Sequence, residues 1–282
     1  MAIQREQTVF FLGAGSMSEA MIKGIVAAGI LPAEQIIIAN RRHPERLAHL
    51  QETYGVRICQ EKQAELAEAG MIIIAVKPFD LAAALQEIAS YVTAQQLVIS
   101  VVAGAATETI EQHFHEAVPV VRAMPNTSSF VQASATALCR GRWADDEHLA
   151  VARQLFAAIG VAVSVEEPLM DAVTGLSGTG PAYFYYVIES LVAGGLACGL
   201  SQEDCRVLME QTVFGVAKML QETGKDPSEL RRQVTSPNGT TMAAMEVLDR
   251  GHGKQLFMHA VQRATQRSVE MGKETTTQPN LV

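Results

Sequence analysis

The chain is poor in cysteine and has no excess of positive charge, and both shortages exclude classes of protein. Its 282 residues include only Cys59, Cys139, Cys198 and Cys205, and no two of them form a CxxC pair. This spacing predicts neither a metal site nor a disulfide framework, and it favours a reducing, cytoplasmic location. With 30 acidic and 22 basic side chains the formal net charge is −8, which argues against a nucleic-acid partner because phosphate backbones require a basic surface.

An uninterrupted membrane-spanning run is also missing. Residues 182–200 are almost wholly apolar, but Glu189 and three glycines interrupt them. A lone carboxylate at bilayer depth is unfavourable, so we expect no membrane span and interpret this segment as a helix buried against others, including those of a second subunit. Residues 1–6 are polar and lack the pattern of a secretory signal.

Short β-rich runs alternate with helical patterns over the first 165 residues. Strands are predicted at residues 8–12, 35–39, 71–76, 97–102, 118–122, 134–138 and 161–165. Helices are predicted from the turn at residues 13–15 through residue 28 and at residues 45–53, 81–91, 107–113 and 146–159. Continuous Val and Ile runs are typical of strands buried on both faces, and the alternating order predicts a parallel sheet. We therefore expect an α/β domain over residues 1–165.

The strand signal disappears after residue 166. Helices are predicted at residues 168–174, 181–198, 202–222, 227–234, 241–250 and 253–271. This change predicts a second, all-α domain over residues 166–282. We expect the tail, residues 272–282, to be frayed, because it carries three threonines, a proline and an asparagine.

The first predicted strand leads into a glycine-rich turn, Gly13-Ala14-Gly15-Ser16-Met17-Ser18. A strand that ends in GxG and opens a helix places backbone N–H groups and the positive helix end where a pyrophosphate binds. Ser18 stands at the third glycine position and is small enough for close packing. A turn that only starts a helix is the alternative, but the position between two strands favours a dinucleotide site.

The end of the second predicted strand indicates which dinucleotide binds. NAD sites usually carry an acid here, whereas this chain reads Ala39-Asn40-Arg41-Arg42 with no acid within reach. Two guanidiniums suit a 2′-phosphate, so NADPH is favoured and NADH is the weaker cofactor. A solvated loop with ordinary surface arginines is the alternative interpretation.

Other predicted strands end in residues that face the same crevice, since ligands bind at the carboxyl ends of parallel strands. The third strand ends in AVKP, residues 75–78, and the fourth in SVVAG, residues 100–104. Lys77 directly follows an apolar run, where a cofactor would pass, although a surface lysine is the alternative. After the fifth strand, Asn126 either contacts the nicotinamide edge or caps a turn.

Two stretches of the helical half are unusually rich in Gly, Ser and Thr. In TGLSGTGP, residues 174–181, packing and ligand contact are both open interpretations. In SPNGTT, residues 236–241, successive N–H groups at a helix start form an anion nest that suits the carboxylate of a small substrate. Capping of that helix by Asn238 or Thr240 is the alternative.

These motifs, GAGSMS, AVKP, RAMPN, TGLSGTGPAY and SPNGTT, occur in an order and spacing that resemble the pyrroline-5-carboxylate reductase family. The resemblance implies a Rossmann-type domain followed by a helical dimerisation domain, in homodimers that commonly assemble into decamers. It also implies the final step of proline biosynthesis: NADPH-dependent reduction of 1-pyrroline-5-carboxylate to L-proline by hydride transfer to the C=N carbon.

The resemblance also implies roles for particular residues. It places Gly13, Ala14, Gly15, Ser16, Met17 and Ser18 at the pyrophosphate, and Arg41 at the 2′-phosphate. It lines the cofactor with Ala75, Val76, Lys77, Pro78, Val101, Val102 and Ala103. It places Glu167, Gly239, Thr240 and Thr241 at the substrate, with the Thr241 hydroxyl beside the ring nitrogen as the catalytic group.

Three positions depart from the family pattern, and two rival functions stay open. Asn238 replaces the first of two glycines, Ser128 replaces a proline, and Gln233 replaces an asparagine. Asn tolerates the left-handed conformation better than most residues. A hydroxyacid dehydrogenase would need a lysine or histidine base in the helical half, where Lys218 has no glycine-flanked motif. A non-catalytic dinucleotide sensor would not need SPNGTT.

Overall fold

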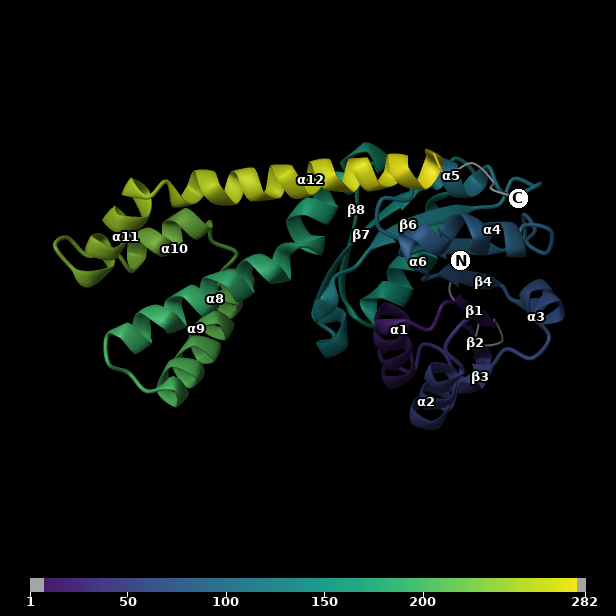
Figure 1. Cartoon of the computed structure of the whole chain (residues 1–282), viewed down its shortest axis with the longest axis horizontal. Helices are drawn as coiled ribbons and strands as arrows, with labels where there is room; N and C mark the ends of the chain where they lie inside the picture. Colours follow the sequence, from purple (N-terminus) through teal and green to yellow (C-terminus); the bar gives the residue numbers. More distant parts are fainter. Residues whose placement is uncertain (1–7, 278–282) are drawn as a thin grey trace. The chain divides into compact units, whose positions relative to one another are not determined.

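The computed structural model describes residues 8–277 of the chain, which divide into two compact units (Figure 1). The first unit runs through Pro181 and resumes at Gln262, and the second is the helical segment Ala182–Val261. The polar segment 1–6, for which we expect no secretory function, lies outside the described residues. The predicted domain limits, 1–165 and 166–282, differ from these units and stay a prediction.

An eight-stranded sheet forms the centre of the first unit. Its strands are β1 (Val9–Leu12), β2 (Ile36–Ala39), β3 (Arg57–Ile58), β4 (Met71–Ile74), β5 (Leu97–Ser100), β6 (Val120–Met124), β7 (Ser134–Arg140) and β8 (Gly160–Ser164). Their order in the sheet is β3-β2-β1-β4-β5-β6-β7-β8. All seven predicted strands are present, with ends that shift by up to two residues. Only β3 was missed, because two residues carry no periodic signal.

The prediction of a parallel sheet is wrong for one pair of strands. Strand β7 runs antiparallel to β6, whereas the other neighbouring strands are parallel. A parallel connection needs a crossover of a dozen or more residues. Only a short segment containing η3 (Thr127–Val131) joins β6 to β7, so the chain reverses there.

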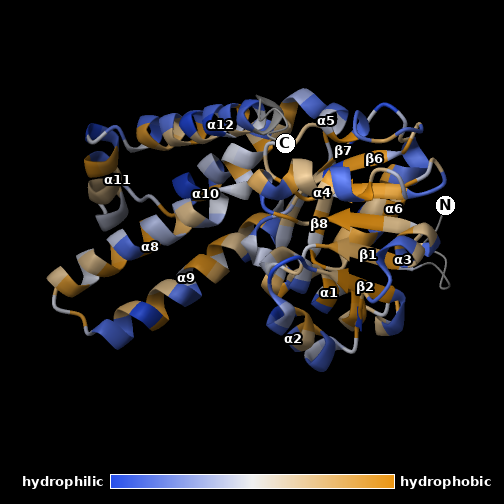
Figure 2. Cartoon of the chain, turned by 45° about the vertical axis from the view of Figure 1, so that its right-hand side comes forward, coloured by the Kyte–Doolittle hydropathy of each residue, from blue (hydrophilic) through white to orange (hydrophobic). Residues whose placement is uncertain are grey.

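Helices cover both faces of the sheet. They are α1 (Ser16–Ala27), α2 (Pro44–Tyr54), α3 (Lys62–Glu68), α4 (Leu81–Ile88), α5 (Thr107–Glu111) and α6 (Asp146–Ala157). Successive strand residues alternate between the faces. Phe11 therefore packs in one apolar cluster with Ile22 and Phe156, and Phe10 in another with Leu85. Figure 2 shows the strands as the hydrophobic centre of this unit. The predicted α/β, Rossmann-type architecture is confirmed.

The remainder of the chain is helical, as predicted. The helices are α7 (Met170–Val173), a π-helix (Thr174–Gly178), α8 (Gly180–Ala197), α9 (Gln202–Thr223), α10 (Pro227–Gln233), α11 (Thr240–Arg250) and α12 (Gly253–Thr277). Among the described helices, none has both the length and the hydropathy of a membrane span. Phe184, Tyr186 and Phe214 on α8 and α9 are 66%, 68% and 61% exposed in the single chain. Apolar surface of this kind is typical of a protein interface.

The expectation of a frayed tail is wrong for residues 272–277, which continue α12. Two contacts hold the end of this helix. The Ser268 hydroxyl donates a hydrogen bond of 2.6 Å to Asp171. Gly272 lies against Gly104, so close that an added Cβ would come within 2.6 Å of the Gly104 carbonyl oxygen. Residues 278–282 of the tail lie outside the described range.

Candidate cofactor and substrate sites

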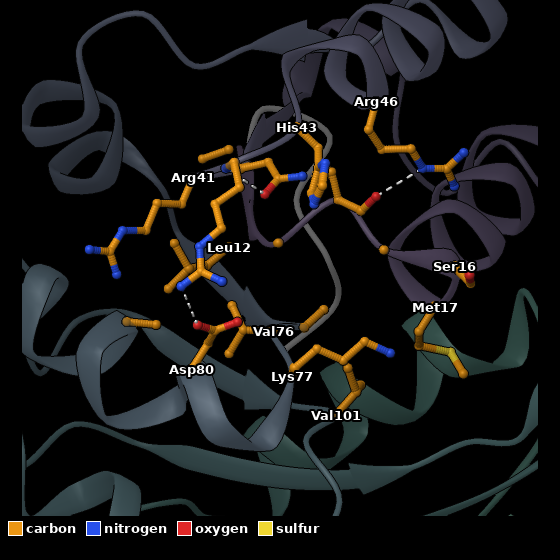
Figure 3. A pocket seen from close by; sticks show the side chains of 18 of the residues that line it. Leu12, Ser16, Met17, Arg41, His43, Arg46, Val76, Lys77, Asp80 and Val101 are labelled. Atoms are coloured by element: carbon orange, nitrogen blue, oxygen red, sulfur yellow. Dashed lines mark hydrogen bonds and ion pairs between the residues drawn. The ribbon is translucent and has the colours of Figure 1, made fainter.

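A cavity of about 930 Å³ opens at the carboxyl ends of β1, β2, β4 and β5 (Figure 3). These strands are consecutive neighbours in the sheet, in the order β2-β1-β4-β5, so the turns that follow them converge. Ten of the predicted cofactor residues line the cavity: Gly13, Ala14, Gly15, Ser16, Met17, Arg41, Ala75, Val76, Lys77 and Val101. Their convergence depends on strand order, which the sequence alone does not display.

Four other predicted cofactor residues do not line this cavity. Ser18 is buried, and its hydroxyl donates a 2.7 Å hydrogen bond to the Gly13 carbonyl, which braces the turn from behind. Val102 is buried in one of the apolar clusters. Pro78 begins the short helix η2 (Pro78–Asp80), and Ala103 follows Val102 in the turn after β5. Direct contact of these four residues with a cofactor stays a prediction.

The glycine turn fits a pyrophosphate. Gly13 has φ +112, and an added Cβ would lie 2.5 Å from the Ala75 carbonyl oxygen, so only glycine suits this position. Gly15 is the N-cap of α1 and, as a glycine, has no side chain that could accept a hydrogen bond from the first N–H groups of the helix. An added Cβ at Gly15 would meet no atom within 4 Å. The N–H groups of the first helical turn therefore stay available to an anion.

Two basic side chains of the cavity are unpaired among the described residues. Arg41 and Lys77 line it and make no hydrogen bond or ion pair with other described side chains. In Figure 3, Arg41 points away from Asp80, while Lys77 extends toward the side where Ser16 and Met17 lie. Both cations are therefore available to the negative charges of a dinucleotide.

The expectation that no acid comes within reach of these arginines is wrong. Arg42 Nη2 lies 3.3 Å from Oδ1 of Asp80, which belongs to η2, 38 residues further along the chain. The expectation concerned only the residues that follow β2 in the sequence, whereas Asp80 belongs to the turn after β4. The Asn40 side chain accepts a 3.4 Å hydrogen bond from the Arg42 backbone N–H and holds the loop.

Arg46 is a site residue that sequence reasoning missed. From α2 its Nε donates a 3.0 Å hydrogen bond to the Ala14 carbonyl, and its guanidinium pairs with Glu19 of α1. Burial acts to raise the pKa of Glu19, but the hydrogen bond and charge of Arg46, together with hydrogen bonds from Tyr54 and His49, outweigh it and hold that pKa below its usual value. Arg46 thus fixes α2 against the glycine turn. Its sequence context is an ordinary amphipathic helix, which gave no signal.

Asn126 acts as a cap. Its Oδ1 accepts a 3.1 Å hydrogen bond from the Ser128 N–H, which makes it the N-cap of η3. Its Nδ2 donates a 3.0 Å hydrogen bond to the Ser177 carbonyl in the π-helix. The TGLSGTGP stretch also packs closely, since an added Cβ at Gly178 would lie 2.6 Å from Met124 Cε. Packing therefore accounts for Gly178, whereas an added Cβ at Gly180 would meet no atom within 4 Å, and ligand contact by this stretch stays an open interpretation.

Glu167 belongs to a partly buried charge network. Arg122 is 3% exposed, and its guanidinium donates to Glu167 Oε1 at 2.9 Å and to Asp171 Oδ1 at 3.4 Å. The Cys139 thiol donates to Glu167 Oε2 at 2.9 Å, and burial raises the pKa of this thiol far above its usual value. A buried guanidinium needs such partners. The contacts describe a structural role for Glu167, and its substrate role stays a prediction.

The SPNGTT turn has a free helix start. Asn238 adopts the left-handed conformation, with φ 58, which confirms that asparagine serves here in place of glycine. The N-cap of α11 is Gly239, without a side-chain hydrogen bond, so the alternative of capping by Asn238 or Thr240 is wrong. Ser236 Oγ occupies the space that a side chain at Gly239 would need. The first N–H groups of α11 are left without a side-chain cap.

Family comparisons agree with this architecture. Residues 167–271 match the family model of pyrroline-5-carboxylate reductase dimerisation, and residues 8–104 match that of the NADP oxidoreductases described as coenzyme F420-dependent. Sheet, glycine turn and helical segment thus define an NADP-type Rossmann oxidoreductase with a dimerisation domain, so the chain forms homo-oligomers.

Individual relatives give the family. The chain is 40% identical to pyrroline-5-carboxylate reductase 1 of Bacillus subtilis over 95% of this chain and 91% of the relative. It is also 40% identical to pyrroline-5-carboxylate reductase of Methanosarcina acetivorans over 95% and 99% of the two chains. A solved pyrroline-5-carboxylate reductase from Coxiella burnetii superposes with a TM-score of 0.86, at 34% identity, over 94% and 98%. The chain belongs to the pyrroline-5-carboxylate reductase family, which confirms the resemblance.

We expect Gly15→Ala to weaken NADP⁺ binding by roughly ten- to 100-fold, because its Cβ would displace a phosphate from about one charge-assisted hydrogen bond. The free energy of unfolding should change by less than about 1 kcal/mol, since the site is open. Calorimetric titration and urea denaturation measure the two quantities. Gly13→Ala is the matched control and should lose stability as well. Unchanged affinity in Gly15→Ala would contradict the assignment of the phosphate site.

Proposed function

We propose that this chain reduces 1-pyrroline-5-carboxylate to L-proline, with hydride transfer from NADPH to the C=N carbon. The observation that carries the proposal is the cavity of this family member, which is lined both by the uncapped start of α1 and by Arg41, a side chain without an ion pair among residues 8–277. A Plasmodium falciparum pyrroline carboxylate reductase solved with NADP bound shares the fold, with a TM-score of 0.84 and 26% identity over 95% of this chain.

Different residues of the cavity would bind different parts of the cofactor. The N–H groups of the turn from Gly13 to Met17 would bind the pyrophosphate, and Arg41 the 2′-phosphate. Ala75, Val76, Lys77 and Val101 would line the remainder, with Ser18, Pro78, Val102 and Ala103 proposed on the resemblance. The bound cofactor supplies the hydride, while the protein supplies orientation and electrostatics. NADH would be the weaker cofactor, because it lacks the phosphate that Arg41 would bind.

The helical unit would bind the substrate. The N–H groups at Gly239, Thr240 and Thr241 begin α11 without a side-chain cap, so they can donate hydrogen bonds to a carboxylate. The Thr241 hydroxyl would orient the imine nitrogen and help to move its proton. A protonated imine is already electrophilic, so the reaction needs no strongly basic side chain. Lys218, the lysine considered for a hydroxyacid dehydrogenase, is exposed on α9 and pairs with Glu222 at 3.5 Å.

Assembly and location complete the proposal. The dimerisation segment supports homodimers, and we propose that they assemble further into decamers, as the resemblance implies. A cytoplasmic location is consistent with Cys59, Cys139, Cys198 and Cys205, all of which are free thiols in the structure.

The purified chain should oxidise NADPH when 1-pyrroline-5-carboxylate is added, with L-proline formed in equal amount. Absorbance at the nicotinamide band follows the first quantity and amino-acid analysis the second. A chain that oxidises NADPH only with a 2-oxo acid would instead be a hydroxyacid dehydrogenase. A chain that binds NADPH and turns over neither substrate would be a sensor. Either result would overturn the proposal.

Replacing the catalytic hydroxyl should slow the reaction. We expect Thr241→Ala to lower kcat/KM for 1-pyrroline-5-carboxylate about 100-fold, the usual scale of acid–base assistance, and Thr241→Ser to restore most of it. The matched control is Thr223→Ala on α9, whose hydroxyl donates to the Met219 carbonyl of its own helix and accepts from the Lys225 backbone N–H just after it. Wild-type kinetics in Thr241→Ala would remove this residue from the mechanism.

A pair of variants separates the two roles of Glu167. Glu167→Gln and Asp171→Asn each remove one carboxylate from buried Arg122, so each should lower the free energy of unfolding by about 1–3 kcal/mol. If Glu167 also serves the substrate, only Glu167→Gln raises KM for 1-pyrroline-5-carboxylate several-fold, with KM for NADPH unchanged. Equal substrate KM in the two variants would leave Glu167 a structural residue alone.

A further inference from the structure

The Arg42–Asp80 ion pair crosses the cofactor cavity. Arg42 follows β2, whereas Asp80 belongs to η2 after β4, and β1 separates these two strands in the sheet. Two strand spacings place the strand ends roughly 10 Å apart, with the glycine turn of β1 between them. The dashed line at Asp80 in Figure 3 marks this contact. Both residues line the cavity, so the pair lies within the space that a dinucleotide would share.

The neighbouring arginines Arg41 and Arg42 therefore differ in their ion pairing. Arg41 makes no ion pair with another described residue, whereas Nη2 of Arg42 forms an ion pair with the Asp80 carboxylate. The pair is loose: a single 3.3 Å contact joins side chains that are 61% and 31% exposed. Exposed ion pairs are weak and exchange readily. An incoming phosphate can thus replace the carboxylate at Arg42.

We infer that Asp80 is a specificity-determining residue that limits the preference of this site for a 2′-phosphate. The inference rests on the proposed function, because it concerns the same nucleotide cavity. Asp80 neutralises part of the Arg42 charge, and its own negative charge repels a phosphate that approaches the two arginines. A nucleotide with a free 2′-hydroxyl carries no charge there, so Asp80 opposes it little. Asp80 thereby keeps the non-phosphorylated nucleotide competitive.

Removing the carboxylate should favour the phosphorylated nucleotide. We expect Asp80→Asn to tighten binding of adenosine 2′,5′-bisphosphate two- to fivefold, the scale of an exposed charge interaction, and to leave adenosine 5′-monophosphate nearly unchanged. Isothermal titration at low salt measures both affinities without catalysis. The gain should shrink as salt is raised, because exposed charges are screened. The ratio of KM for NADH to KM for NADPH should rise by a similar factor.

Two controls identify the cause. Glu87 also lines the cavity but pairs with Lys62 at 2.6 Å, so Glu87→Gln removes a carboxylate without freeing Arg42 and should give a smaller gain. In an Arg42→Gln background, Asp80→Asn should lose most of its effect, as a double-mutant cycle requires of coupled residues.

The binding measurements can overturn the inference about Asp80 in three ways. Unchanged or weaker binding of the bisphosphate to Asp80→Asn overturns the inference, as does an equal gain in Glu87→Gln or a full gain without Arg42. These results leave the proposed function intact, provided that the wild-type chain binds both nucleotides. A wild-type chain that binds neither nucleotide overturns the proposed function and the inference together.

Discussion

The cofactor half of the molecule depends on the contact between Gly13 and the backbone of Ala75. The turn after β1 can pass this close to the end of β4 only because Gly13 has no Cβ and adopts φ +112. This approach directs the start of α1 toward the ends of the neighbouring strands. Ser18 and Arg46 then secure the turn from two sides through the carbonyls of Gly13 and Ala14. A turn that offers its backbone N–H groups to an anion thus needs one residue without a Cβ, here Gly13, so that it can pass close to the neighbouring strand end.

Charge is distributed according to burial. Around Arg122, which is almost fully buried, two carboxylates supply the pairing that an interior guanidinium requires. At the cavity, Arg41 and Lys77 are exposed and can stay unpaired, because water solvates them until a ligand arrives. Arg42 lies between these cases, loosely held by Asp80. The same residue type is therefore paired where it is buried and available to a ligand where it is exposed.

Motifs whose chemistry is local could be predicted well. The GAGSMS turn and the SPNGTT helix start lie where backbone geometry within a few residues decides the conformation, whereas the pairing of Arg42 after β2 depends on the distant Asp80. The contacts of Asn126 and Glu167 were harder to predict, because their partners, Ser177 and Arg122, lie 51 and 45 residues away in the sequence. Asp80 and Arg46 belong to no motif that would have marked them as site residues. For these residues the decisive neighbour comes from another strand end or another helix.

Periodicity and short motifs are properties of consecutive residues, so they sufficed to predict the alternation of strands and helices, the helical second half and the family. Three features became visible only in the folded chain: β7 runs antiparallel to β6, α12 continues to Thr277, and Asp80 pairs with Arg42 across the cavity. Each of them depends on contacts between segments far apart in the chain, and strand order and packing bring those segments together.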